Sequence, residues 1–290
     1  MSVGHNKDVL MMRVVSWNIA GRHEPWRQLR EMGADVALLQ EARNPPPDVA
    51  SDVEIGGEPW LKHQFDRWCR VVRLSDRVRV EHFTQIDPIS VAESEQMPVS
   101  GIGINAAARV IPEGGAPFVA VSTYARWMRP HPTTRSKWSV GFPDGSAHRA
   151  ISDLSAFIGD TDPSTHRIIV AGDLNMDPNF WSKDGQDPLW HARERTVWTR
   201  MEALGFDYLG PHDGPTYHST RASPENPTNQ LDHVFASRGF SNAIAVRALN
   251  DPAEWGASDH CRVLIEVPLR AASVTVSPRG SRQSWRRDRP

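Results

Sequence analysis

Short apolar runs alternate with amphipathic stretches along most of the chain. The runs are rich in β-branched residues, which is typical of buried strands, and they span residues 12–17, 36–39, 70–74, 78–83, 102–110, 118–124, 167–170, 231–236 and 261–267. Stretches with apolar residues at helical spacing predict helices that begin near Pro25, Ser146 and Pro188 and end at Gly33, Gly159 and Gly205. The pattern predicts an α/β protein, and so many strands favour two packed mixed sheets flanked by helices.

The length of the chain suits a single domain. A chain of 290 residues is long enough to bury a substantial core, and we expect one domain over residues 10–270. From Ala271 the composition turns to Ser, Arg and Pro, which predicts a disordered tail over residues 271–290. Segments 44–57, 129–145 and 211–229 are rich in Pro, Gly and polar residues and are predicted to be long loops, which more often serve function than not.

Charge, cysteine content and hydropathy limit the class of protein. The formal net charge is −2, so the chain as a whole does not attract a polyanion. Cys69 and Cys261 lie in apolar runs, which favours buried thiols in a reducing compartment over a disulfide or a zinc site. The sequence has no apolar run of about 18 residues and begins with polar residues, so we expect a cytoplasmic protein without a membrane span. Nothing in the sequence indicates an obligate protein partner.

Acids and amides follow two of the predicted strands. Glu41 comes after an apolar run, so its carboxylate should emerge at the strand's carboxyl end and suits Mg²⁺, although it can also be a solvated acid that begins a loop. Asp173 and Asn175 are two residues apart after another run, so both side chains can point the same way. The Asp can deprotonate water and the Asn amide can donate to a phosphate, whereas the alternative is an Asx turn.

A third group, Ser258-Asp259-His260, precedes the last apolar run. A protonated imidazole there can neutralise charge on a phosphate, and a carboxylate such as Asp232 can orient it and raise its pKa. Asp259 is then available to assist metal or phosphate binding. Taken alone, an Asp-His pair is more often a surface hydrogen bond.

Together these groups resemble the endonuclease/exonuclease/phosphatase superfamily. The matching segments are Ser16–Ile19 (SWNI), Leu39–Glu41 (LQE), Gly172–Asn175 (GDLN), Leu231–Phe235 (LDHVF) and Ser258–His260 (SDH), and the likeness spans about residues 14–267. The resemblance implies a four-layer α/β sandwich, with two mixed β-sheets face to face and helices outside. It also implies hydrolysis of phosphodiesters or phosphomonoesters with a divalent metal.

The resemblance assigns metal-binding roles to three residues. Glu41 is similar to the principal Mg²⁺ ligand of the family, with Asn18 beside it. Asp259 looks like a further acid near the metal. Mg²⁺ is the expected cofactor, with Mn²⁺ as an alternative.

Four further residues are similar to the family's catalytic groups. Asp173 resembles the acid that positions or deprotonates water, and Asn175 resembles its amide partner. His260 looks like the phosphate-binding imidazole and Asp232 like the carboxylate paired with it. The implied reaction is direct attack by water without a covalent enzyme intermediate.

One segment departs from much of the family. Many members have Thr-His-Leu after the central strand, where this chain has Ser122-Thr123-Tyr124-Ala125. A tyrosine there is similar to the abasic-site endonuclease branch, where its phenol can hydrogen-bond phosphate or aid the leaving oxygen, so Tyr124 joins the predicted catalytic residues. The residues after Tyr124 do not reproduce that branch's following motif, so the resemblance does not extend to DNA repair.

A basic stretch follows Tyr124. Residues 114–143 contain no Asp or Glu but carry the predicted substrate contacts Arg126, Trp127, Arg129 and Arg135. Cations and flat rings are the ingredients of a nucleic-acid groove, whereas the alternative is a loop with solvated arginines and tryptophans that fill the core.

Three functions are consistent with the sequence. A metal-dependent nuclease is favoured by the basic, Trp-bearing stretch, and DNA and RNA are equally open as substrates. The alternative is a phosphatase or phosphodiesterase that acts on a small molecule or lipid head group, which a pocket closed by segment 211–229 would favour. A binding protein without turnover is disfavoured because the acids, amides and imidazole are all present.

Overall fold

Two six-stranded sheets carry the fold. The computed structural model describes residues 10–56, 68–100, 105–126, 132–135, 144–177 and 188–269. The first sheet has the strand order β13 (Ala245–Leu249), β14 (Arg262–Pro268), β1 (Met11–Asn18), β2 (Val36–Ala42), β4 (Trp68–Arg73), β3 (Glu54–Ile55). The second has the order β11 (Phe206–Gly210), β12 (Asp232–Ser237), β10 (Ile168–Asp173), β9 (Phe118–Tyr124), β8 (Asn105–Pro112), β5 (Val78–His82). The pairs β1–β2 and β9–β10 are parallel and the other pairs within these sheets are antiparallel, so the prediction of mixed sheets is confirmed.

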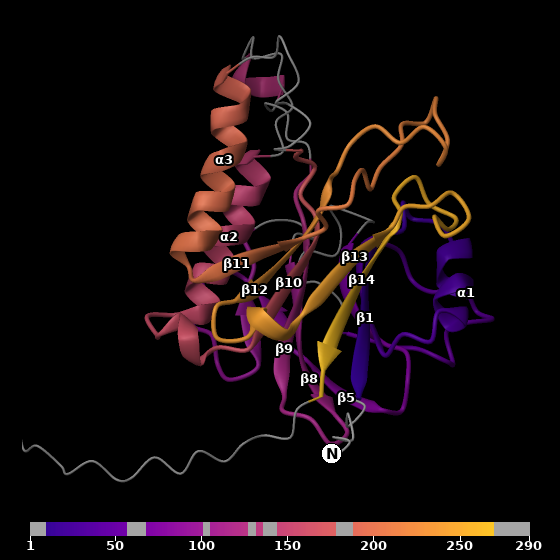
Figure 1. Ribbon diagram of the computed structural model, residues 1–290. Helices are drawn as coiled ribbons and strands as arrows, with labels where there is room; N and C mark the ends of the chain where they lie inside the picture. Colours follow the sequence, from indigo (N-terminus) through magenta and orange to yellow (C-terminus); the bar gives the residue numbers. More distant parts are fainter. Residues whose placement is uncertain are drawn as a thin grey trace, which may run out of the picture.

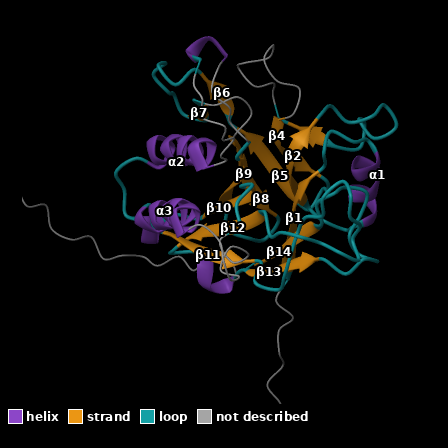
Figure 2. Cartoon of the chain, turned by 90° about the horizontal axis from the view of Figure 1, so that it is seen from above, coloured by secondary structure: helices purple, strands orange, loops and turns teal. Residues whose placement is uncertain are grey.

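Helices cover the outer faces of the sheets and complete four layers (Figures 1 and 2). Helix α1 (Glu24–Glu31) lies on the first sheet, and helices α2 (Asp144–Ile158) and α3 (Pro188–Ala203) lie side by side on the second. The described residues also include the short pair β6 (Thr84–Ile86) and β7 (Gln96–Pro98) and 3-10 helices at Pro132–Thr134, Pro163–Thr165 and Ser241–Ala243. The four-layer α/β sandwich predicted from the sequence is therefore confirmed.

The three largest apolar clusters of the described residues follow from this layering. Alternate residues of β1 and β10, such as Val14 and Ile169, point between the two sheets and form the central cluster. Trp26 of α1 packs on the outer face of the first sheet, and Leu154 of α2 and Val197 of α3 pack on the outer face of the second. The strands are buried on both faces, which is why they appear in the sequence as nearly continuous apolar runs.

The inner faces of the strands change from apolar to polar toward one end of the sandwich. Along β1 the inward positions are Val14, Ser16 and Asn18, and along β10 they are Ile169, Ala171 and Asp173. Strand β9 follows the same order, with Phe118, Ala120, Ser122 and Tyr124. The polar end coincides with the carboxyl ends of the parallel pairs β1–β2 and β9–β10.

A hydrogen-bonded layer lies directly beneath that polar end. Gln40 of β2 is fully buried and its Nε2 donates to Ser122 Oγ on β9 at 2.9 Å and to Ser16 Oγ on β1 at 3.4 Å. Ser122 Oγ donates in turn to the carbonyl oxygen of Leu39 at 2.7 Å. Because buried hydrogen bonds have a fixed geometry, this layer sets the register of one sheet against the other.

Gly172 permits the close packing of β10 against β9. A Cβ atom at this position would lie 1.8 Å from the carbonyl oxygen of Thr123 and 2.8 Å from its carbonyl carbon. No side chain fits in that space, so the residue before Asp173 has to be glycine.

The structure also refines several sequence predictions. The three predicted helices are present, and Cys69 and Cys261 are buried free thiols, as expected. The short strands β3, β6, β7, β11 and β13 were not predicted, because edge strands of two to five residues carry little periodic signal. Segment 211–229 is a loop, as predicted, whereas the predicted tail 271–290 and most of segment 129–145 lie outside the described residues. Within the described residues, no helix has the length and apolar character needed to cross a membrane.

Candidate active site

Seven polar residues from both sheets meet at the polar end of the sandwich. Three hydrogen bonds join the sheets there, and we call their six residues the polar seam: Asn18 with Asp173, Glu41 with Tyr124, and His260 with Asp232. The seventh residue is Asn175. In each pair, one residue belongs to a strand of the first sheet or lies next to one, and the other residue belongs to the second sheet. The seam therefore forms only when the two sheets pack face to face.

Asp173 lies at the end of β10 and accepts three hydrogen bonds. Its Oδ2 accepts from Asn18 Nδ2 at 2.9 Å and from Asn175 Nδ2 at 3.1 Å, and its Oδ1 accepts from the backbone N–H of Asn175 at 2.7 Å. Asn175 has a left-handed backbone with φ of 51°, which asparagine tolerates better than most residues. The turn expected as the alternative for this segment is therefore present, and it orients the carboxylate.

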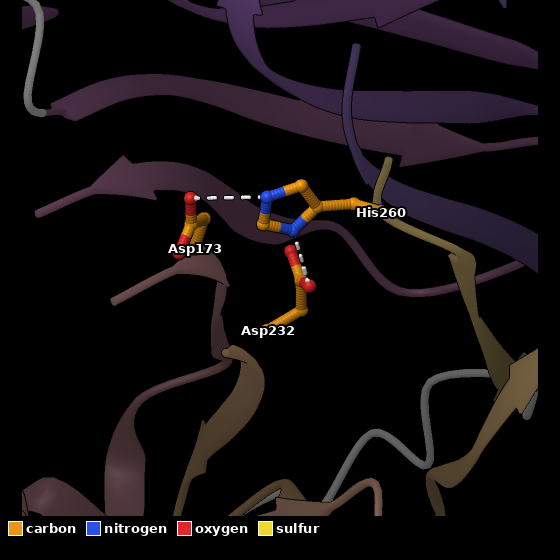
Figure 3. A group of neighbouring side chains, drawn as sticks. All are labelled: Asp173, Asp232 and His260. Carbon is orange, nitrogen blue, oxygen red and sulfur yellow. Dashed lines mark hydrogen bonds and ion pairs between the residues drawn. The ribbon is translucent and has the colours of Figure 1, made fainter. Parts of the chain in front are cut away.

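His260 lies between two carboxylates (Figure 3). Its Nδ1 is 2.8 Å from Asp232 Oδ2 and its Nε2 is 3.8 Å from Asp173 Oδ2. Since both ring nitrogens face an acid, the imidazole is favoured in its protonated form with two N–H donors. Burial alone would lower the pKa of His260, but the charges of Asp232, Asp173 and Asp259 raise it to about 10.

The pKa of Asp173 is also displaced. Burial raises the pKa of this carboxyl group to about 7, while the positive charge of His260 and the hydrogen bond from Asn18 act in the opposite direction. The negative charge of Asp232 adds to the increase. A carboxylate with a pKa near neutrality is matched to the task of a general base.

Asp232 is held at the start of β12 by a residue from the 211–229 loop. Thr216 Oγ1 accepts hydrogen bonds from the backbone N–H groups of Asp232 at 3.1 Å and Leu231 at 3.0 Å. Asp232 also pairs with Asp173 in the β10–β12 ladder. These contacts fix the backbone at Asp232, whose carboxylate orients His260.

Glu41 reaches the seam because the backbone of β2 is irregular there. Regular alternation would place Glu41 on the same face as Leu39 and Ala37, toward α1. Instead Glu41 has a left-handed backbone with φ of 48°, and the β2–β4 register shifts between Leu39 and Ala42. Its Oε1 accepts a hydrogen bond from Tyr124 OH at 2.7 Å. Left-handed backbone costs a glutamate roughly 1 kcal/mol or more, which is typical of strain retained at functional sites.

The structure positions some of the other predicted residues. Asp259 is partly exposed next to His260, and Ser258 Oγ donates to its Oδ1 at 3.2 Å. Arg126 is partly exposed two residues after Tyr124, and Arg135 is exposed after the first 3-10 helix. Trp127 and Arg129 lie outside the described residues.

Tyr217 is a component of the site that the sequence did not indicate. It lies in the 211–229 loop, forms an isolated β-bridge with His260, and its ring centroid is 4.9 Å from the imidazole centroid. Burial raises the pKa of Tyr217, and the charges of Asp259, Asp173 and Glu41 raise it further. The phenol therefore lies among the acids of the site, although no sequence pattern separates it from its loop neighbours.

Oxygen donors at the seam fit a hard divalent cation. Asp173, Asp232 and His260 have potential ligand atoms within 4.8 Å of one another, and the buried Asp232 Oδ1 has no hydrogen-bond partner among the described residues. His260 is a poor ligand there, because both of its nitrogens face carboxylates. Glu41 offers a partly exposed carboxylate, and Asn18 on the adjacent strand end offers an amide oxygen. Carboxylate and amide oxygens are suitable ligands for Mg²⁺.

Solved structures with the same fold include several nucleases. The endonuclease domain of TRAS1, a telomere-specific non-LTR retrotransposon, matches with a TM-score of 0.61 and 17% identity, covering 90% of this chain and 99% of that one. The AP endonuclease LMAP from Leishmania major matches with a TM-score of 0.61 and 17% identity over 89% and 88% of the two chains. The 3′-5′ exonuclease NExo from Neisseria meningitidis matches with a TM-score of 0.56 and 15% identity over 89% and 100%.

Sequence comparison identifies the family. No curated protein matches the chain significantly. The model of the endonuclease/exonuclease/phosphatase family matches residues 15–260, which include every residue of the polar seam. The chain therefore belongs to the endonuclease/exonuclease/phosphatase family of phosphoester-hydrolysing enzymes.

Proposed function

We propose that this enzyme is a divalent-metal-dependent nuclease that hydrolyses backbone phosphodiesters by direct attack of water. The observation that carries the proposal is the polar seam, where the carboxylates of Asp173 and Glu41 and the imidazole of His260 come from both sheets to one place. In the proposal they act as general base, metal ligand and cation. Hydrolysis of a phosphodiester needs these three functions close together.

The metal site in this proposal is centred on Glu41. Asn18 and Asp259 are the further ligands, through the amide oxygen and the carboxylate. Tyr124 donates to Glu41 and so orients the carboxylate that binds the ion. Mg²⁺ or Mn²⁺ bound there would polarise the phosphoryl oxygen and stabilise the leaving oxygen.

The proton transfer is assigned to Asp173. Its carboxylate, oriented by the Asn18 and Asn175 amides, takes a proton from the attacking water. His260, protonated and held by Asp232, donates from Nε2 to a phosphate oxygen and neutralises charge that develops as the water attacks. The imidazolium does not need to transfer its proton in this scheme.

A nucleic-acid substrate is supported by two observations. The proteins that share the fold at TM-scores of 0.56 to 0.61 include an endonuclease domain, an AP endonuclease and a 3′-5′ exonuclease. On this chain, Arg126 follows the end of β9 directly after the seam, and Arg135 lies nine residues further along. The guanidinium group of Arg126, two residues after Tyr124, suits a phosphate that flanks the scissile bond.

A second candidate function is hydrolysis of a terminal or small-molecule phosphate. Tyr217 packs on His260 from the 211–229 loop and so covers one side of the imidazole, which favours a small substrate over a long one. A structure of NExo, described as a 3′ phosphatase and bound to a product DNA hairpin, has the same fold at a TM-score of 0.54 and 16% identity. The fold thus accommodates phosphate removal as well as strand cleavage.

A substrate panel distinguishes the two candidates. The enzyme is incubated with Mg²⁺ or Mn²⁺ and with supercoiled plasmid, abasic-site duplex, single-stranded DNA, RNA, a 3′-phosphorylated oligonucleotide or inositol phosphates. EDTA and the Asp173→Asn variant serve as controls. The proposal predicts metal-dependent cleavage of at least one polynucleotide that both controls abolish. Release of phosphate from the small esters alone would establish the second function and overturn the first.

A further inference from the structure

A hollow lies at the end of the second sheet opposite the polar seam. Its volume is about 480 Å³, within the ~300–1,000 Å³ that is usual for small-molecule sites. Strand β10 contributes Ile168, its first residue, to the hollow and Asp173, its last residue, to the seam. A six-residue strand spans roughly 17 Å at about 3.3 Å per residue, so the hollow is separate from the catalytic residues.

Phenylalanine side chains form one wall of the hollow. Phe83 and Phe157 line it with their ring centroids 5.4 Å apart, and both pack against the core under α2. Phe118, at the start of β9, also lines the hollow, but its ring points between the sheets and packs on Phe240. Aromatic surface of this kind favours a flat ring as the bound group, because offset or edge-to-face contacts between rings are favourable.

The rest of the lining is basic. Arg109, His166 and Arg167 line the hollow, and its described lining contains no Asp or Glu. Arg109 Nη1 lies 3.5 Å from Glu81 Oε2, which is outside the lining and whose other oxygen pairs with Arg79. The carboxylate of Glu81 is thus shared between Arg79 and Arg109. Because it neutralises only part of their charge, the lining of the hollow keeps a positive charge.

Arg167 is held in place without an acidic partner. Its Nε donates to the carbonyl oxygen of Pro117 at 3.1 Å, and its guanidinium carbon lies 4.1 Å from the centroid of the Phe240 ring. Burial lowers the pKa of Arg167, and no carboxylate of the described chain forms an ion pair with it. These contacts fix the plane of the guanidinium group and leave its terminal nitrogens to bind an anion in a bidentate manner.

We propose that this hollow binds a nucleoside 5′-monophosphate. The base packs against Phe83 and Phe157, and the phosphate accepts hydrogen bonds from Arg167 and Arg109. The observations that favour an organic phosphate over a neutral ring or a free ion are the aromatic wall and the arginines that line the same hollow. Binding at this place does not depend on the hydrolysis proposed above.

Isothermal titration calorimetry in EDTA tests the proposal with three probes: adenosine 5′-monophosphate, adenosine and inorganic phosphate. The nucleotide is expected to bind one site per chain, and each partial probe to bind about tenfold more weakly or worse, because each makes only one of the two sets of contacts. Arg167→Met is expected to weaken nucleotide binding by about tenfold or more, since it removes charged hydrogen bonds but keeps much of the side-chain volume.

Controls separate this site from the catalytic one. Arg247→Met removes an exposed arginine that pairs with Glu254 at 3.1 Å on the first sheet, and it should leave nucleotide binding unchanged. His260→Ala should also retain binding, and Arg167→Met should hydrolyse substrate at the wild-type rate.

If Arg167→Met does not fold, Arg109→Gln replaces it, with weaker binding again expected. Equal affinity for adenosine and its monophosphate, wild-type binding in the folded arginine variant, or loss of binding in His260→Ala would each overturn the proposal.

Discussion

The apolar centre of the inter-sheet space and the polar seam are built on the same strands, two to four residues apart. On β10 the inward residue is Ile169 in the centre and Asp173 at the seam, and on β1 it is Val14 in the centre and Asn18 at the seam. The backbone continues in the same extended form between the two regions, so only the side chains change. The centre stabilises the fold by removing apolar surface from water, whereas the seam holds buried charges and the strained backbone of Glu41 at the place of the proposed hydrolysis. This comparison predicts that substitutions in the two regions affect different measurements.

The largest effect is expected for Asp173→Asn at the seam. The neutral amide cannot take a proton from water, so turnover should fall by about a hundredfold or more. The free energy of unfolding should change little, because the variant replaces one accepting oxygen by an amide nitrogen but also removes a buried charge. Steady-state kinetics and chemical denaturation of the same preparation measure the two quantities.

Asp251→Asn is the matched control, since this acid is exposed and its carboxylate accepts a hydrogen bond from the backbone N–H of Ala253 rather than from a residue of the seam. It should retain wild-type turnover. Wild-type turnover in Asp173→Asn would remove Asp173 from the mechanism.

The second prediction concerns the apolar centre. Ile169 is fully buried, and Ile169→Ala should lower the free energy of unfolding by about 2–5 kcal/mol, because it removes buried carbon and leaves a cavity. Turnover per folded molecule should stay near the wild-type value. Urea denaturation measures the stability, and Ile89→Ala is the control because Ile89 is 90% exposed.

Equal effects of the Ile169 and Ile89 substitutions would show that the centre does not carry the stability assigned to it. A large loss of turnover in folded Ile169→Ala would show that the two regions are not separable.

A smaller effect is expected for Tyr124→Phe. The variant keeps the ring but loses the hydroxyl that donates to Glu41, so the carboxylate is less well oriented. Loss of a hydrogen bond to a metal ligand typically costs ~10–100-fold in metal affinity. The metal concentration that gives half-maximal activity should rise by that amount while the folded structure is retained.

Tyr208→Phe is the control, because Tyr208 hydrogen-bonds to Pro211 and Gln230 and makes no hydrogen bond to Glu41. An unchanged metal requirement in Tyr124→Phe would contradict the placement of the ion at Glu41.

The smallest effect is expected in the dependence of turnover on pH. Asp173 must be ionised to accept a proton, so the rate should decline as pH falls through about 7. His260 must be protonated, so the rate should decline again as pH rises through about 10. Each decline should reach about tenfold per pH unit beyond the corresponding pKa.

Asp232→Asn sharpens this prediction. It removes a carboxylate that raises the pKa of His260, so the alkaline decline should move to lower pH. An alkaline limb that stays in place would show that it does not report the ionisation of His260.

The sequence predicts the layers of this protein better than the contacts between them. Apolar runs and helix stop signals gave three helices and most of the long strands, because these depend on local periodicity. The hydrogen bond between Glu41 and Tyr124 and the link between Gln40 and Ser122 depend on which strands face each other across the sandwich. The spacing of residues along the chain does not indicate which strands of the two sheets lie opposite each other.

Two residues show the same limit within single segments. The left-handed backbone at Glu41 brings its side chain to the seam, although regular alternation would have sent it to the outer face of the sheet. Tyr217 reaches His260 from a loop whose path is set by tertiary hydrogen bonds, such as that from Cys261 N–H to the Thr216 carbonyl. No local pattern of apolar and polar residues predicts the irregular backbone at Glu41 or the path of the 211–229 loop.

Gly172 has a consequence for how the enzyme can vary. Every single-nucleotide change of a glycine codon that alters the residue adds a Cβ atom, and at this position that atom would overlap the Thr123 carbonyl oxygen. The spacing of β9 and β10 therefore prevents any single substitution of Gly172 from being accommodated, whatever the chemistry of the new side chain. New substrate preferences have to arise instead in segments that end at the rim of the sandwich, where the backbone has room to accept different side chains.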